Sequence, residues 1–172
     1  MSKKYPSLID RALEGDEEAR YLVVERVLSP VFDLAWHLTR EVDPSRALCV
    51  QALTGLDARL RAGDLGMNEP VGAAVAALLA AYGDGSPLVT IDPFAKLGRD
   101  DLLLALSALV ADVDTRDLER LFGDDAGARL EEILDGSPLP LAVLRELLDE
   151  VSAAVALPEN LWPEPPVDDE EP

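Results

Sequence analysis

Residues 8–44 read LIDRALEGDEEARYLVVERVLSPVFDLAWHLTREVDP, and this stretch decides the fold class of the chain. Its apolar residues recur at steps of three and four, which is the spacing of one buried face on a helix. Gly15 and Asp16 interrupt that spacing, and such a pair is typical of one helix ending and the next being capped. The pattern therefore predicts a short helix that begins at Ser7 and a second helix from Asp16 to about Leu28.

Two further interruptions follow, and each is a capping residue directly before a proline. Ser29-Pro30 and Asp43-Pro44 place proline at a first helical position, where its missing N–H removes no helical hydrogen bond. They predict a third helix that starts at Ser29-Pro30 and runs through Arg40, and a fourth helix that starts at Asp43-Pro44 and runs to about Arg61. Asn68 is the predicted N-cap of a fifth, alanine-rich helix that ends at Tyr82.

The second half of the chain also has the apolar spacing of helices, after an interruption. Residues 83–98 are rich in glycine and proline, which is typical of a linker loop. Helical spacing then returns in four segments between residues 99 and 156, and an acidic, proline-rich tail follows at 157–172. We therefore predict an all-α fold of two small helical units, residues 1–82 and 99–156, joined by the 83–98 loop.

The composition fits a globular protein without a membrane span. The chain has 172 residues, of which 48% are apolar and 28% charged. No apolar run approaches the ~20 residues that cross a bilayer. The single cysteine, Cys49, excludes an internal disulfide, and the N-terminus places charge where a leader needs apolar residues. These features predict a cytoplasmic protein.

The charge of the chain is strongly acidic and unevenly distributed. The formal net charge is −19, of which residues 69–172 contribute −17, from six Lys/Arg and 23 Asp/Glu. Binding to a nucleic acid needs clustered cations that neutralise phosphates. We therefore expect the second half of the chain to repel nucleic acid and to attract basic partners.

The opening stretch resembles extracytoplasmic-function sigma factors, the small bacterial subunits that direct RNA polymerase to promoters. These proteins carry a Gly-Asp-x-x-Ala step, a leucine-rich helix, a proline-valine-aromatic turn, a helix with Leu-Ala and a short Asp-Pro loop. The corresponding elements here have the same order and spacing: Gly15 to Ala19, Leu22 to Leu28, Pro30 to Phe32, Leu34-Ala35 and Asp43-Pro44. The resemblance implies that residues 47–64 lie where the family carries its polymerase-docking helix.

That helix supplies the candidate protein-binding residues. Its apolar side should face the core, through Cys49, Ala52, Leu53, Leu56 and Leu60. Its other side would then present polar residues to a partner, namely Arg46, Gln51, Asp57 and Arg59. The resemblance implies that this partner is the RNA polymerase core or a sigma regulator.

Residues 128–155 resemble the C-terminal helix-turn-helix of the same family, but the residues that contact DNA are replaced. The expected recognition helix has Arg145 alone against Glu146, Asp149 and Glu150. The stretch that would melt a promoter, residues 64–81, has no cation and no aromatic residue. The docking helix also lacks the acidic pair usual in the family. We therefore expect weakened polymerase docking and no direct binding of nucleic acid.

The sequence predicts no catalytic, cofactor-binding or metal-binding residue, and so no enzyme. His37 is the only histidine, which excludes a metal site built on a histidine pair, and it lies mid-helix beside Trp36 and Leu38. Cys49 has no basic neighbour that would lower its thiol pKa. Both residues are therefore expected to be structural.

Several alternatives stay open at this stage. Trp162 in the acidic tail is a candidate docking motif for a partner, an anchor on the protein's own core, or a residue without a role. The chain as a whole is a sigma-like protein without DNA contacts, a working sigma factor with an unusual surface, or an acidic helical binding module of the adaptor, immunity or DNA-mimic type. Adaptation to a salty cytoplasm would also account for the charge. The sequence does not constrain the oligomeric state.

Overall fold

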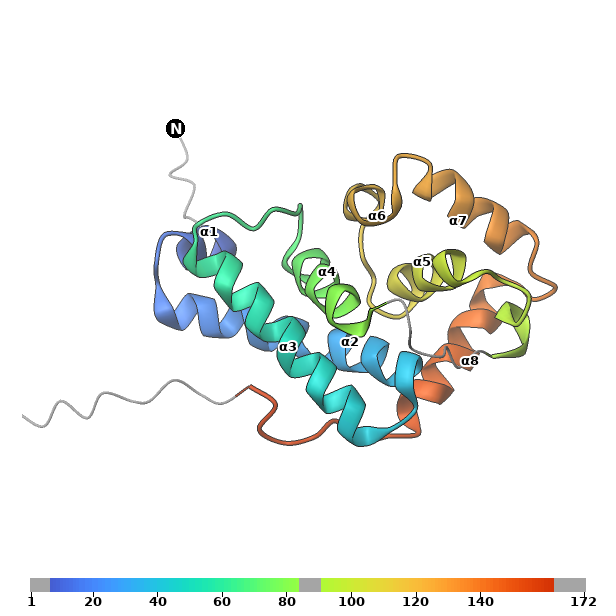
Figure 1. Cartoon of the computed structure of the whole chain (residues 1–172), viewed down its shortest axis with the longest axis horizontal. Coiled ribbons are helices and arrows are strands. Elements are labelled where there is room, and N and C mark those ends of the chain that lie inside the picture. Colours follow the sequence, from blue (N-terminus) through green and yellow to red (C-terminus); the bar gives the residue numbers. More distant parts are fainter. Residues whose placement is uncertain (1–6, 84–90, 163–172) are drawn as a thin grey trace, which may run out of the picture.

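The computed structural model describes residues 7–83 and 91–162, and these residues are helical with no strand among them. The all-α prediction is therefore confirmed. The elements, labelled in Figure 1, are α1 (Leu8–Leu13), α2 (Glu17–Thr39), α3 (Val42–Arg61), α4 (Pro70–Tyr82), the 3₁₀ helix η1 (Asp92–Phe94), α5 (Arg99–Leu109), α6 (Thr115–Phe122), α7 (Ala126–Asp135) and α8 (Leu141–Ala153).

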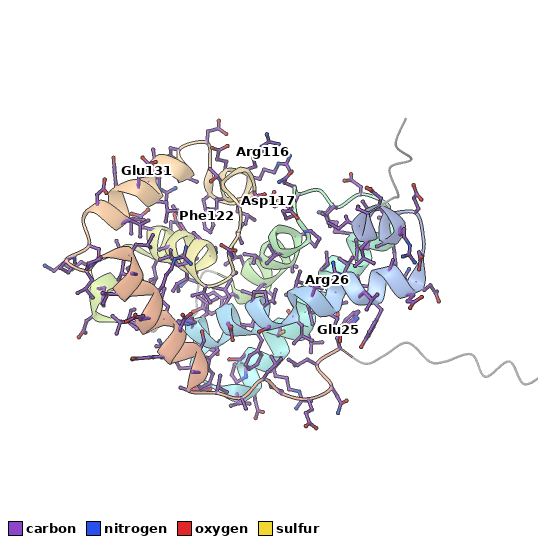
Figure 2. All side chains as sticks on the ribbon, turned by 180° about the vertical axis from the view of Figure 1, so that it is seen from behind. Glu25, Arg26, Arg116, Asp117, Phe122 and Glu131 are labelled. Atoms are coloured by element: carbon purple, nitrogen blue, oxygen red, sulfur yellow. The ribbon has the colours of Figure 1, made fainter. Side chains whose placement is uncertain are left out.

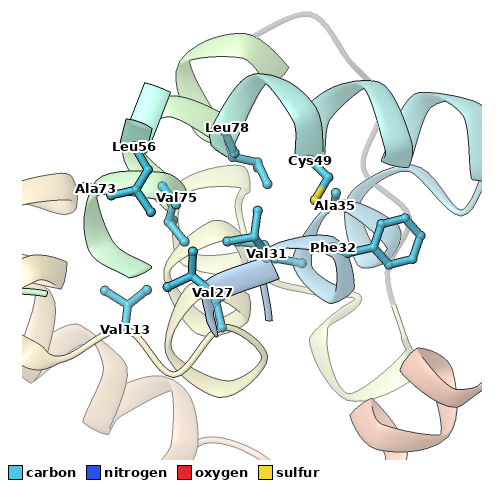
Figure 3. Close-up of a cluster of buried hydrophobic side chains, with 14 of the residues drawn as sticks. Val27, Val31, Phe32, Ala35, Cys49, Leu56, Ala73, Val75, Leu78 and Val113 are labelled. Atoms are coloured by element: carbon cyan, nitrogen blue, oxygen red, sulfur yellow. The ribbon is translucent and has the colours of Figure 1, made fainter. Parts of the chain in front are cut away.

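Helices α2, α3 and α4 pack against one another and enclose the main core, while α1 lies against α2 and α3. Figure 3 shows Val31 and Phe32 of α2 in this core with Cys49 of α3 and Leu78 of α4, and all four are buried. Each fully buried side chain of this size contributes about 1.5–3 kcal/mol. Apolar burial at the contacts of α2, α3 and α4 therefore contributes strongly to the stability of this part of the molecule.

The predicted break at Ser29-Pro30 is wrong, because α2 runs through Pro30 as one helix of 23 residues. A proline inside a helix costs about 3 kcal/mol through a lost hydrogen bond and a steric clash. Val27 before the proline and Val31 and Leu34 after it are buried in the same core. Their burial outweighs that cost.

Helices α5, α6 and α7 pack against one another, and this group contacts α2 and α4. Helix α8 makes its most extensive helix contact with α2 rather than with α7, from which residues 136–140 separate it. Within the predicted linker, η1 places Phe94 in the core. The two halves of the chain thus meet along several packed surfaces.

The joint between α2 and α8 is apolar with two polar anchors. Leu144 and Leu148 of α8 are buried in it. The Trp36 indole N–H donates to the Val151 carbonyl at 2.9 Å, and the His37 Nε2 lies 3.0 Å from the Ser152 hydroxyl. These bonds fix the C-terminal turn of α8 on the C-terminal turn of α2.

A buried carboxylate makes the second joint, between α6 and the start of α4. The Asp117 carboxylate accepts backbone N–H bonds from Asn68 at 2.6 Å and from Glu69 at 2.9 Å. Figure 2 labels Asp117 on α6, on the side toward α4. A Cβ added at Gly72 would lie closer than van der Waals contact to this carboxylate, so the close approach requires glycine there.

The predicted capping of α4 by Asn68 is therefore wrong. Glu69 occupies the N-cap position without a side-chain cap hydrogen bond, and Asp117, 48 positions further along the chain, accepts from the N–H groups of Asn68 and Glu69 directly before the helix. The Asn68 side chain instead donates to Asp114, which itself caps α6 by accepting from the Asp117 N–H. Two helix starts thereby share one polar cluster.

Replacing Asp117 with alanine tests this joint. The backbone N–H groups of Asn68 and Glu69, directly before α4, would lose their buried acceptor, so we expect Asp117→Ala to lower the free energy of unfolding by about 2–3 kcal/mol. Asp124→Ala, at an exposed position seven residues on, is the matched control and should have little effect. Urea denaturation of both variants makes the measurement, and equal midpoints would contradict the role of Asp117 in holding α6 to the start of α4.

Candidate protein-binding surface

Helix α3 has one buried side and one exposed side, as its apolar spacing predicts. The residues expected in the core are all fully buried: Cys49, Ala52, Leu53, Leu56 and Leu60. Arg46, Gln51 and Arg59 are exposed. Because α2 and α4 cover two sides of α3, the third side forms part of the surface of the molecule.

The start of α3 differs from the prediction. The helix begins at Val42 with Glu41 in the N-cap position, so Pro44 is its third residue rather than its first. Ser45 ties this turn together, because its hydroxyl donates to the Glu41 carbonyl at 2.7 Å and lies 2.6 Å from the Thr39 hydroxyl. This cluster connects the end of α2 to the start of α3 and thereby orients the exposed residues.

Asp57 belongs to the joint between α2 and α3 rather than to the free surface. Its side chain is only 17% exposed, and it pairs with Arg20 of α2 at 3.0 Å and with Arg61 at 2.8 Å. Arg20 is itself buried. The carboxylate is thus held within the protein, and Arg46, Gln51 and Arg59 are the predicted residues that face solvent.

The two exposed arginines lie on different flanks of α3. Thirteen residues separate Arg46 from Arg59, which places them about 20 Å apart along the axis and roughly 140° apart around it. Arg46 precedes Asp57 by eleven residues and so lies on the flank toward α2. Gln51 lies between the two flanks. A partner that contacts both arginines must therefore cover most of the exposed side of α3.

The flank toward α4 is hollowed, a feature that the sequence pattern did not indicate. Gly55 approaches Ala77 so closely that a Cβ at position 55 would lie 2.6 Å from the Ala77 Cβ. Beside this crossing is a hollow of about 250 Å³, lined mainly by small and apolar side chains with Arg59 at its edge. A second hollow of about 350 Å³, which includes Leu48 and Tyr82, lies near the start of α3. Apolar side chains of a partner would fit this flank.

Trp162 lies apart from the α3 residues in the sequence but is not free in solution. The preceding residue, Leu161, is buried, and Trp162 is partly buried and packs against the core. Among the three interpretations of this tryptophan, packing on the protein's own core is the one that the structure shows.

The histidine and the cysteine are buried in structural positions. His37 is 1% exposed, and burial, aided by the nearby Arg40 guanidinium, lowers its pKa to about 4. Burial also raises the pKa of the Cys49 thiol to about 12. Neither group is accessible to a substrate. Within residues 7–83 and 91–162, no three His, Cys, Asp or Glu side chains are grouped so as to hold a metal ion.

The outward side of α8 is acidic. Glu146, Asp149 and Glu150 are exposed there with Arg145 as the one cation of the helix. Phosphate contacts need cations and base contacts need hydrogen-bonding side chains in a groove. Among the exposed charged residues of α8, three are acidic and one is basic.

Comparison of the chain with protein-family models gave no match, and comparisons with curated proteins and with solved structures gave no significant match. None of the helices in the described part of the chain has the length and apolar character needed to traverse a bilayer.

The buried His37 predicts a specific pH dependence of stability. With a folded pKa of about 4 against 6.5 in the unfolded chain, the unfolded state binds an extra proton between these values. Stability should therefore fall as pH drops from 7 to 4.5, by on the order of 2 kcal/mol from this residue. Burial and the nearby Asp149 raise the pKa of Asp33, so this residue makes the free energy of unfolding rise on acidification. Its contribution is the same in the wild type and in a variant changed at His37.

Urea denaturation of wild type and His37→Gln at pH 7 and pH 4.5 makes the measurement. The variant should lose less stability on acidification than the wild type does, because glutamine does not titrate. Equal losses in the two proteins would contradict a neutral, buried His37.

Proposed function

We propose that this protein is a non-enzymatic, sigma-like transcription protein that binds the RNA polymerase core or a sigma regulator through α3 and makes no direct promoter contact. One observation carries the proposal: the helix with the sigma-like pattern buries the side expected in the core and exposes Arg46, Gln51 and Arg59. The resemblance of residues 8–64 to the family supports the choice of partner.

The rest of the surface supports the loss of DNA contacts. Helix α8, which corresponds in the sequence to the recognition helix, carries three exposed acids against one arginine. Its last turn is also bonded to α2 through Trp36 and His37. Such a helix suits protein contact better than entry into a DNA groove.

A second candidate function rests on the same acidic surface. Exposed acids lie on α7 and α8, at Glu131, Glu132, Asp135, Glu146, Asp149 and Glu150. An acidic surface of this kind steers basic proteins toward it at low salt. The alternative is therefore an acidic helical binding module, of the adaptor, immunity or DNA-mimic type, that acts outside transcription.

Titration with the isolated coiled-coil clamp fragment of RNA polymerase tests the first candidate. Because the acidic pair of the family is missing, we expect micromolar affinity at best, which corresponds to about −8 kcal/mol. Arg46→Glu with Arg59→Glu should weaken binding at least tenfold, or about 1.4 kcal/mol. The matched control is Arg145→Glu, which reverses an exposed charge on α8 and should leave binding unchanged.

Thermal melts of all variants establish that the helix is still folded. Since Arg46 and Arg59 lie on different flanks, the single variants show which flank carries the contact. Undetectable wild-type binding at about 100 μM would contradict polymerase docking and favour the acidic module. A pull-down against core polymerase gives the same distinction in a whole complex.

A labelled DNA duplex tests the loss of promoter contacts. We expect no measurable binding by fluorescence anisotropy at physiological salt, because three acids and one arginine on α8 repel the phosphate backbone. Micromolar binding that weakens steeply with added salt would contradict this prediction.

A further inference from the structure

The chain beyond α8 folds back over the N-terminal helices. In Figures 1 and 2 it ends beside α2 and α3, on the opposite side of the molecule from α6 and α7. Leu161 is only 3% exposed, and Val155 and Trp162 are partly buried against the core. Leu157 in the middle of the segment is 46% exposed. The contact is therefore concentrated near the two ends of the segment.

The local backbone turns Leu161 inward. Asn160 has a φ of +58°, in the left-handed region that asparagine tolerates better than most residues. Glu159 and Asn160 are exposed, and the next residue, Leu161, is buried. The segment thus presents a single leucine-tryptophan pair at a turn.

The side chains of this segment that contact the core are apolar. No hydrogen bond connects residues 155–162 to the rest of the described chain. An element of the fold is normally fixed by backbone hydrogen bonds, whereas a bound peptide can be held by a few anchoring side chains. In sequence, residues 163–172 then contain four prolines and five acids.

We propose that the surface of α2 and α3 beside residues 155–162 is a peptide-docking site, and that its occupant is this segment of the chain itself, acting as a displaceable internal ligand. This inference does not depend on the proposed function. It implies that a partner using this part of α2 and α3 must first release the segment, so that the segment limits access to the site.

The strength required of such a contact is modest. A flexible connection of this length gives an effective concentration of about 1 mM. An affinity of about 100 μM for the detached segment then keeps the site roughly tenfold more often occupied than empty. A partner with micromolar affinity at the same site would displace the segment.

Fluorine NMR of the full chain labelled with 5-fluorotryptophan tests the internal contact. The chain has two tryptophans, so the spectrum should show one resonance for Trp36 and one for Trp162. Leu161→Ser should move the Trp162 resonance to the shift of a free peptide of residues 156–172 and leave the Trp36 resonance in place. An unmoved Trp162 resonance, or one already at the free-peptide shift in wild type, would overturn the inference.

Two controls show whether the Leu161→Ser variant is still folded and whether the effect is specific to Leu161. Trp36 is fixed between α2 and α8, so its resonance reports whether the helices are intact in the variant. Leu157→Ser, which alters an exposed leucine of the same segment, is the matched control and should leave both resonances unchanged.

Binding of the labelled peptide 156–172 tests the site itself. The peptide should bind the full-length Leu161→Ser, Trp162→Ala variant at least tenfold more tightly than wild type, whose site is already occupied. A peptide with both substitutions should not bind. Equal binding to the two proteins, or no binding to the variant up to about 1 mM, would overturn the inference.

Discussion

The hydrogen bonds from the Asn68 and Glu69 N–H groups to the buried Asp117 carboxylate are the interaction on which the arrangement of the two halves depends. A buried carboxylate is stable only if its oxygens accept hydrogen bonds, and Asn68 and Glu69 supply them from the start of α4. This requirement fixes α6 on α4, and glycine at position 72 allows the approach. Since α4 also packs along α2 and α3, the C-terminal helices are positioned by the same contact. The α2–α8 joint at His37 closes the opposite side.

These joints explain why α3 is the helix available for a partner. Helix α2 covers one flank of α3 and holds Asp57 through Arg20, while α4 covers the other flank at the Gly55–Ala77 crossing. What remains outward is a strip with an arginine at each edge and hollows on the side of α4. The acidic face of α8 lies on a separate helix, so the chain offers two surfaces of opposite character. The proposed transcription role uses the first surface, and the alternative role uses the second.

The sequence was sufficient for features that depend on local periodicity. Helical spacing predicted the all-α fold, and the burial of Cys49, Leu53 and Leu56 agrees with the predicted orientation of α3. It was insufficient where a distant residue decides the outcome. Pro30 remains inside a helix because burial of its neighbours in the core outweighs its cost. The N-cap of α4 is Glu69 rather than Asn68, and the N–H groups of both residues donate to the distant Asp117. Asp57 is predicted from its spacing to face solvent, but Arg20, 37 positions earlier in the sequence, pairs with it. The burial of Leu161 likewise depends on helices far away in the sequence.

Hydrogen–deuterium exchange of the full chain, alone and mixed with core RNA polymerase, tests most directly whether α3 is the binding surface. The proposed function predicts slower exchange in residues 42–61 on addition of polymerase, with α7 and α8 unchanged. Slower exchange confined to α7 and α8, or no change anywhere in the chain, would contradict it.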